Sequence, residues 1–285
     1  MVDPGVEPLR ARALLVAIVA SVRALGPLRR PVARSVGGVW YAMVPAKVRV
    51  RAAANHRRLQ PALSREQARA LARRSYIEYV AMIFDAIWAE RLTPERIRRL
   101  VHFTGMQHLA VGDANGGVLA ICHFGNWDMA ASAAMAIGRP LSTVMAPIGS
   151  ELITSMVRLS RARKKLELFT PQQAARGLAR ALRQGRLVAL MADVPEAGPT
   201  VVVPYCGGPV RFSAVPARIA AATSKPVIPV ACWRDGRRWV VQFQAPIDAA
   251  VGGEVATMAA VAAATEPAVR RRPEQWYPFH EVYAG

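Results

Sequence analysis

Short apolar runs that alternate with helical segments limit most strongly how this chain can fold. The apolar runs span residues 118–122, 141–145 and 186–192. The intervening segments with helical sequences span residues 129–137, 150–165 and 170–184. Buried strands that alternate with helices indicate an α/β domain with a largely parallel sheet. We therefore expect a mixed, largely parallel central sheet flanked by helices.

Reactive side chains gather in the loop after the first apolar run, which contains His123, Gly125, Asn126 and Asp128. In open α/β sheets, ligands bind beyond the carboxyl ends of the strands. On one continuous helix, a five-residue step would rotate His123 and Asp128 apart by about 140°. The two side chains can therefore meet only if the chain turns at Gly125 and Asp128 lies in the first turn of the next helix.

We predict that Asp128 accepts the N–H of the His123 imidazole and fixes its tautomer. The other ring nitrogen would then act as a base toward a hydroxyl group. The competing interpretation is a buried histidine bonded to a backbone carbonyl, with Asp128 as an ordinary residue of a helix N-terminus.

The composition combines 53% hydrophobic residues with a formal net charge of +19. Nucleic-acid-binding proteins are basic but seldom this apolar, so an anionic membrane surface is the expected partner and nucleic acid is not. The three cysteines have no paired spacing, which argues against a disulfide framework or a zinc site and favours a reducing compartment.

The N-terminal segment, residues 1–45, is expected to be a helical appendage that associates with a membrane, and residues 46–285 to form the main domain. The apolar stretch of the N-terminal segment, residues 13–22, is flanked by arginines and is shorter than the roughly 20 residues that a membrane-spanning helix needs. We therefore expect an interfacial anchor. A secretory signal is disfavoured because no cleavage site follows; a helix packed on the domain is the other alternative.

The string His-Phe-Gly-Asn-Trp-Asp, residues 123–128, directly follows a strand and resembles the H-x4-D motif of the bacterial lipid A biosynthesis acyltransferase family. This family includes the phosphatidylinositol mannoside acyltransferases and belongs to the lysophospholipid acyltransferase superfamily. Weaker similarities follow in the family's order, up to the closing Pro-Glu-Gln-Trp at residues 273–276.

The resemblance implies that an acyl group moves from acyl-ACP or acyl-CoA, as co-substrate, to a hydroxyl of a membrane glycolipid. His123 would be the general base, without a metal or another cofactor. The protein would work at the cytoplasmic face of the bacterial inner membrane, peripherally or through an N-terminal anchor. The acceptor would be similar to a lipid A precursor, with a phosphatidylinositol mannoside or another lysolipid as the alternative.

Further residues are candidates for substrate binding. Gly125 and Asn126 lie where an oxyanion would form, and a phosphate could be bound by Arg161 or Arg163. Asp193 and Glu196 follow the third apolar run and offer a second carboxylate, although a turn-forming role is equally compatible. Three other histidines stand apart from any carboxylate pattern, and we expect them to be structural or to lie on the surface: His102, His108 and His280.

A different class of function also fits the charge and the apolar N-terminus. A non-catalytic basic adaptor would bind anionic membranes in a salt-sensitive way without consuming an acyl thioester.

Overall fold

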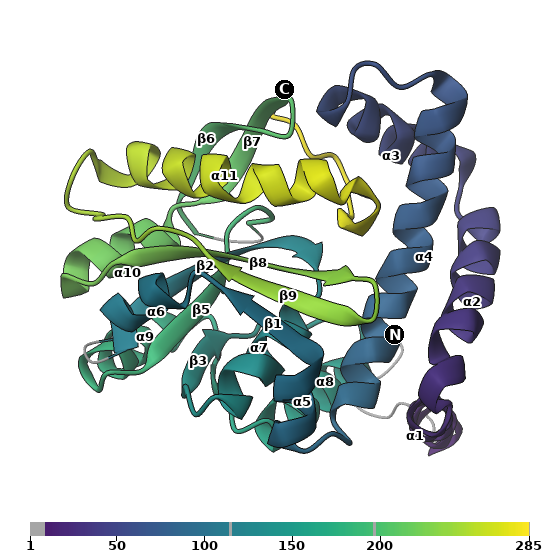
Figure 1. Cartoon of the computed structure of the whole chain (residues 1–285), viewed down its shortest axis with the longest axis horizontal. Helices are drawn as coiled ribbons and strands as arrows, with labels where there is room; N and C mark the ends of the chain where they lie inside the picture. Colours follow the sequence, from purple (N-terminus) through teal and green to yellow (C-terminus); the bar gives the residue numbers. More distant parts are fainter. Residues whose placement is uncertain (1–8, 114–115, 196–197, 285) are drawn as a thin grey trace, which may run out of the picture.

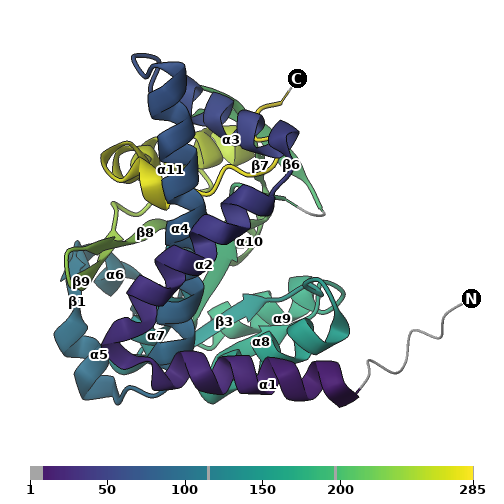
Figure 2. The ribbon, with the colours of Figure 1, turned by 90° about the vertical axis from the view of Figure 1, so that its right-hand side faces the viewer.

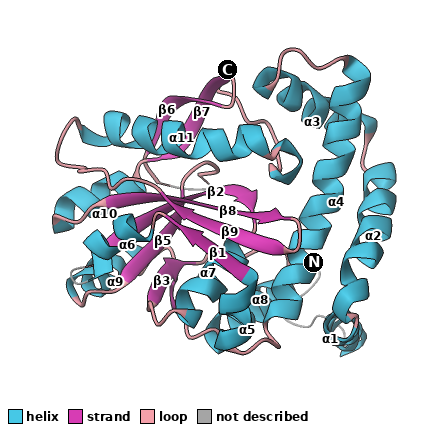
Figure 3. Cartoon of the chain, in the orientation of Figure 1, coloured by secondary structure: helices cyan, strands magenta, loops and turns pink. Residues whose placement is uncertain are grey.

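The computed structural model describes residues 9–113, 116–195 and 198–284. Helices and strands alternate through most of the chain (Figure 1, Figure 3). The helices are α1 (Leu9–Ala24), α2 (Arg29–Met43), α3 (Ala46–Leu59), α4 (Arg65–Ala89), α5 (Pro94–Leu100), α6 (Met106–Asp113), α7 (Trp127–Ala136), α8 (Glu151–Arg163), α9 (Ala174–Arg183), α10 (Val215–Thr223) and α11 (Gly253–Arg271), with short 3-10 turns η1 (Gly26–Leu28) and η2 (Pro273–Gln275). The strands are β1 (Val101–Thr104), β2 (Gly117–Gly125), β3 (Leu141–Val144), β4 (Glu167–Phe169), β5 (Leu187–Met191), β6 (Thr200–Tyr205), β7 (Gly208–Ser213), β8 (Val227–Asp235) and β9 (Arg238–Phe243).

A seven-stranded sheet in the order β1-β9-β8-β2-β5-β3-β4 forms the centre of the fold. Its neighbouring strands run parallel except β8 and β9, which pair as an antiparallel hairpin. The predicted mixed, largely parallel sheet is therefore confirmed. Strands β1 and β4 were not predicted, because runs of four and three residues are too short for an alternating pattern to stand out.

The central strand β2 sends its side chains into two apolar cores, one on each face of the sheet. Val118 and Ala120 pack in the core that contains residues of α9, α10 and α11. Leu119 and Ile121 pack in the core that contains residues of α5, α6 and α7. Figure 1 shows α11 on one face of the sheet and α5 and α7 on the other. Burial on both faces explains why this strand is apolar without alternation.

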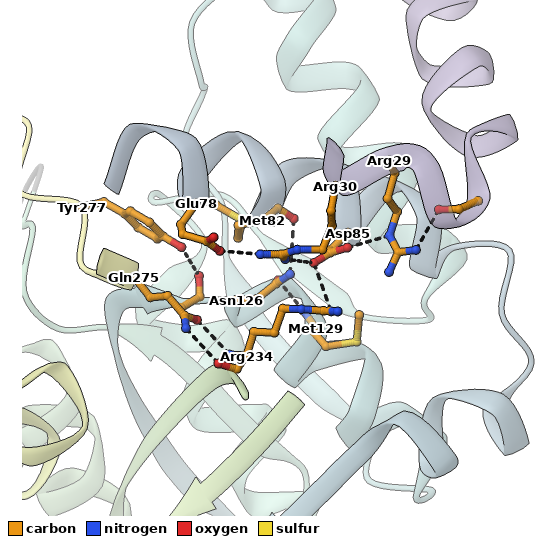
Figure 4. A network of polar contacts seen from close by, with 12 residues as sticks. Arg29, Arg30, Glu78, Met82, Asp85, Asn126, Met129, Arg234, Gln275 and Tyr277 are labelled. Atoms are coloured by element: carbon orange, nitrogen blue, oxygen red, sulfur yellow. Dashed lines mark hydrogen bonds and ion pairs between the residues drawn. The ribbon is translucent and has the colours of Figure 1, made fainter. Parts of the chain in front are cut away.

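Helix α4 supports the N-terminal helices and reaches the sheet. It begins at a capping box between Ser64 and Gln67. Helices α1, α2 and α3 all contact it, and α1 crosses its lower end in Figure 2. A buried ion network joins α2 to α4, in which Arg29 and Arg30 both contact Asp85 (Figure 4). The predicted division at residue 45 stays a prediction.

The N-terminal helices expose an unusual number of apolar side chains. Those on α1, η1 and α2 are Leu14, Val16, Ile18, Leu28, Val32, Val36, Val39 and Met43. Within the described ranges, none of the helices combines the length and the apolar character that crossing a bilayer requires.

Candidate active site

His123 lies where the regular pairing of β2 with β8 is interrupted. The two strands are in register as far as Ile121, and pairing resumes at Gly125 opposite Cys232. Gly125 has a φ of +63°, and a Cβ at this position would lie 1.8 Å from the carbonyl oxygen of Cys232. Only glycine therefore fits the turn. The interruption leaves the His123 side chain 32% exposed at the end of a strand that is otherwise buried.

Asn126 fastens the turn to three other parts of the chain. Its backbone N–H donates to the carbonyl of Cys232 at 2.8 Å. Its side-chain oxygen caps α7 by accepting from the N–H of Met129 at 2.8 Å, and its amide nitrogen donates to the carbonyl of Met82 at 3.3 Å (Figure 4). Asn126 is 3% exposed and both ends of its side-chain amide are engaged within the protein, so it holds the turn in place. Its predicted contact with substrate stays a prediction.

The His123 ring is paired with the carboxylate of Asp193, which follows β5. Nδ1 of His123 lies 2.8 Å from Oδ1 of Asp193. The backbone N–H of His123 also donates to this carboxylate, at 3.0 Å to Oδ1 and 2.8 Å to Oδ2. The Asp193 side chain is 5% exposed, so these bonds compensate for its burial. A proton on Nδ1, shared with Asp193, makes Nε2 the basic nitrogen of the ring.

The sequence prediction gave the orienting role to Asp128, and the structure instead brings Asp193 against Nδ1. The reason is the register of two parallel neighbours: β2 and β5 pair up to Ile121 opposite Met191. Two residues further along each strand, His123 and Asp193 lie side by side. Asp193, predicted only as an additional carboxylate, therefore belongs to the site.

Asp128 lies in the first turn of α7, as predicted, and faces basic residues of α8 and its C-terminus. Its Oδ1 is 3.8 Å from Nε of Arg161 and 3.7 Å from Nζ of Lys164. The Lys164 side chain is only 8% exposed. Burial, and then the negative charge of Asp128, raise the pKa of Tyr79 on α4. Three charged side chains therefore lie next to the His123 turn: Asp128, Arg161 and Lys164. Tyr79 lies close enough to respond to the charge of Asp128.

The two arginines predicted to bind phosphate separate in the structure. Arg161 lies near Asp128, whereas Nη1 of Arg163 lies 3.6 Å from Oε2 of Glu90 at the end of α4. Glu196, the other carboxylate predicted after β5, lies outside the described residues.

An aromatic wall was not predicted as part of the site. Trp127 contacts the His123 ring edge to face, with ring centroids 5.2 Å apart, and also faces Tyr277 at 6.1 Å. The Tyr277 hydroxyl donates to the carbonyl of Gly125 at 3.0 Å. Tyr277 in turn contacts Tyr79 at 5.1 Å. The aromatic sequence near the C-terminus was the available signal, but only folding brings it back against the His123 turn.

His280 also belongs to the electrostatic surroundings of this site, although the sequence set it apart. Its pKa is lowered, mainly by burial and also by His123 and Arg51, while Asp193 opposes the shift. The backbone around it is held by Asn55, whose side-chain amide donates to the carbonyls of Pro278 and His280 at 3.0 and 3.1 Å. The C-terminal segment thus lines the site from the side of α3.

In the part of the chain that the structure describes, histidine, cysteine and acidic side chains do not gather in groups of three or more that could hold a metal ion. The three cysteines are free thiols and are buried.

The sequence of this chain is similar to those of known proteins. The phosphatidylinositol mannoside acyltransferase of Mycobacterium tuberculosis is 29% identical over 179 residues, which cover 61% of this chain and 57% of the relative. This chain therefore spans little more than half of that relative's length. The corresponding protein of Mycolicibacterium smegmatis is 26% identical over 213 residues, covering 73% of this chain and 70% of the relative.

One solved structure is also similar, the 1-acyl-sn-glycerophosphate (LPA) acyltransferase PlsC of Thermotoga maritima. It covers 86% of this chain and 98% of its own, at 13% identity and a TM-score of 0.41.

The family match extends much further along the sequence than the pairwise ones. Residues 8–284 match the family described as bacterial lipid A biosynthesis acyltransferase. The chain therefore belongs to the bacterial lipid A biosynthesis acyltransferase family.

Proposed function

We propose that this protein transfers a fatty acyl group from an acyl thioester, carried by coenzyme A or acyl carrier protein, to a hydroxyl of a membrane glycolipid. The observation that carries the proposal is the pair formed by His123 and Asp193 at the carboxyl ends of β2 and β5. A histidine that is oriented by a buried carboxylate is a general base suited to activating a hydroxyl group.

The reaction needs one proton carrier. His123 takes the proton of the acceptor hydroxyl at Nε2 while the hydroxyl oxygen attacks the thioester carbonyl. When the tetrahedral intermediate collapses, the carbon–sulfur bond breaks and the thiolate leaves with the proton that the imidazolium returns. An ester and a free thiol are formed, and no covalent enzyme intermediate is required.

Asp193 would stabilise the imidazolium that forms during the attack. Its carboxylate already accepts from the ring and from the backbone N–H of His123, so it needs no rearrangement when the ring becomes charged. Asp128, with Arg161 and Lys164, would hold the polar part of a substrate beside the base. Guanidinium and ammonium groups favour a phosphate there.

A glycolipid acceptor is supported by the family, and a mannoside acceptor by the relatives, both of which are phosphatidylinositol mannoside acyltransferases. A lipid A precursor is the acceptor suggested by the family description. Assays with both classes of acceptor separate these two possibilities.

A membrane-surface location is supported by the N-terminal helices. Exposed apolar side chains such as Leu14, Val39 and Met43 lie on α1 and α2, and the whole chain has a net charge of +19. Apolar insertion together with attraction to anionic lipids is the combination that anchors a protein to a membrane interface.

The test is acyl transfer by the purified full chain, with labelled acyl-CoA and acyl-ACP as donors and extracted membrane glycolipids as acceptors. We expect acylated lipid from the wild type and none from His123→Ala, while His102→Ala, which replaces an exposed histidine on β1, keeps full activity. Turnover by His123→Ala would refute the mechanism.

The same assay distinguishes an enzyme from an adaptor. A basic adaptor would bind anionic vesicles in a salt-sensitive manner and consume none of the donors. Release of free fatty acid without acylated lipid would indicate a hydrolase instead.

A further inference from the structure

A basic pocket lies between the N-terminal helix α1 and the end of α4, and none of its lining residues belongs to the His123 turn. It has a volume of about 490 Å³ and is lined by Ala20 and Arg23 of α1, Glu90 and Arg91 after α4, and Arg163 of α8. Three of these five residues are arginines. Figure 2 shows α1 crossing the end of α4 beside α8.

The carboxylate of Glu90 holds two of the pocket's arginines in place. Its side chain is 7% exposed and pairs with Arg23, while Nη1 of Arg163 lies 3.6 Å away. Its other oxygen accepts from the hydroxyl of Ser160. Arginines from two different helices are therefore held around one buried carboxylate, which a freely solvated charged surface would not do.

The pocket has more donors than this carboxylate can use. Each guanidinium carries five N–H groups, and Arg91 uses one of them to bond the carbonyl of Arg23 at 2.8 Å. Nε of Arg23 is shielded from solvent and has no hydrogen-bond partner within the described ranges of the chain. Three cations against one carboxylate leave two positive charges, which match the charge of about −1.5 to −2 on a phosphate monoester at pH 7.

We infer that this pocket binds a phosphate group. The forked guanidinium groups of the three arginines can each donate two parallel N–H bonds to a pair of phosphate oxygens. Helix α8 connects the pocket to the catalytic turn, because Arg163 faces Glu90 whereas Arg161 faces Asp128.

Two sources of phosphate fit this position. The proposed function suggests these two sources, but phosphate binding itself does not depend on it. The first is a lipid headgroup, because α1 forms one wall of the pocket and exposes Leu14, Val16 and Ile18. The second is the 3′-phosphate of a coenzyme A donor. The phosphate chemistry is the same in both cases.

Binding measurements without turnover test the pocket independently of the acyl transfer reaction. We would compare wild type with Arg91→Gln and with Arg91→Gln/Arg163→Gln. The probes are coenzyme A against dephospho-coenzyme A by calorimetry, and phosphatidylcholine vesicles with and without phosphatidic acid by sedimentation. We expect each substitution to weaken binding of the phosphate source about tenfold, the effect of losing one charge-assisted bond of about 1.4 kcal/mol.

The matched control is Arg96→Gln/Arg99→Gln, which removes the same charge from exposed positions of α5. If the pocket variants bind coenzyme A more weakly than wild type but bind dephospho-coenzyme A equally well, the phosphate belongs to the acyl donor. Selective loss of binding to phosphatidic acid would identify a lipid headgroup. If both probes bind the pocket variants as they bind the control, the inference is refuted. Arg91→Gln leaves the contacts of Glu90 intact, so it remains informative if the double variant does not fold.

Discussion

Nε of Arg29 on α2 lies 2.6 Å from Oδ1 of Asp85 on α4, and only 1% of the Asp85 side chain is exposed. The other oxygen of Asp85 lies 2.7 Å from Nη1 of Arg30 and 3.7 Å from Nη1 of Arg234 on β8. One turn earlier on α4, the carbonyl of Met82 accepts from the side chain of Asn126 in the turn after His123. Helix α4 thus joins the exposed N-terminal helices to the active site through a buried charge cluster (Figure 4).

Replacing the buried carboxylate of Asp85 should destabilise the fold strongly. Asp85→Asn leaves the buried guanidinium group of Arg29 without its counter-ion, whereas Arg30 keeps its pair with Glu78. We expect a loss of about 3–5 kcal/mol in the free energy of unfolding. Denaturation by urea measures this change. Glu95→Gln, which removes an exposed carboxylate near Arg98, is the matched control and should leave stability nearly unchanged. An equal effect of the two substitutions would contradict the role assigned to Asp85.

The two aspartates near His123 should differ in their effect on catalysis. Asp193→Asn removes the carboxylate that holds Nδ1, and we expect kcat to fall by about 10²–10⁴-fold, the range contributed by a positioned general base. Asp128→Asn leaves that bond intact and should mainly raise KM through the loss of charge near Arg161 and Lys164. Steady-state kinetics separates the two effects. A larger kcat loss for Asp128→Asn would return the orienting role to that residue.

The catalytic turn should tolerate no side chain at Gly125. In Gly125→Ala the new Cβ would lie 1.8 Å from the carbonyl oxygen of Cys232, so the backbone must move and activity should be lost. Gly138→Ala is the control, because Gly138 also has a positive φ but its Cβ would meet no atom within 4 Å. We expect that control to lose only about 1–2 kcal/mol of stability, from its left-handed backbone, and to keep its activity. An active Gly125→Ala enzyme would show that the turn can relax.

His56 should make stability depend on pH. It is fully buried, its Nε2 lies 2.9 Å from the Ser75 hydroxyl, and burial lowers its pKa to about 3. The folded state therefore binds fewer protons than the unfolded state, whose histidine titrates near pH 6.5. The stability associated with the neutral ring is present above pH 6.5 and is lost as the pH falls toward 3, by about 1.4 kcal/mol per pH unit.

Urea denaturation of wild type and His56→Gln between pH 7 and pH 4 measures this contribution. Other groups titrate in both proteins, so the difference between the two curves isolates His56. We expect the difference in unfolding free energy to shrink as the pH falls. A difference that is independent of pH would mean that the buried ring becomes protonated without cost.

The sequence was sufficient for the predictions that depend on local pattern. The apolar runs that became β2, β3 and β5 were predicted from neighbouring residues. His123 was likewise expected at a strand end, because a strand that stops in a polar loop is visible within about ten residues. Strands β1 and β4 were missed because they are stabilised by their neighbours in the sheet and carry little pattern of their own.

The composition of the catalytic turn, the α/β class and the family were thus determined by the sequence itself. The partner of His123 was decided only by the tertiary structure, because Asp193 is 70 residues away in the chain and reaches the ring through the parallel register of β2 and β5. The same holds for the Tyr277 contact, the separation of Arg161 from Arg163 and the pocket around Glu90. Local sequence specifies how a segment folds, whereas the pairing of distant segments depends on the packing of the whole chain.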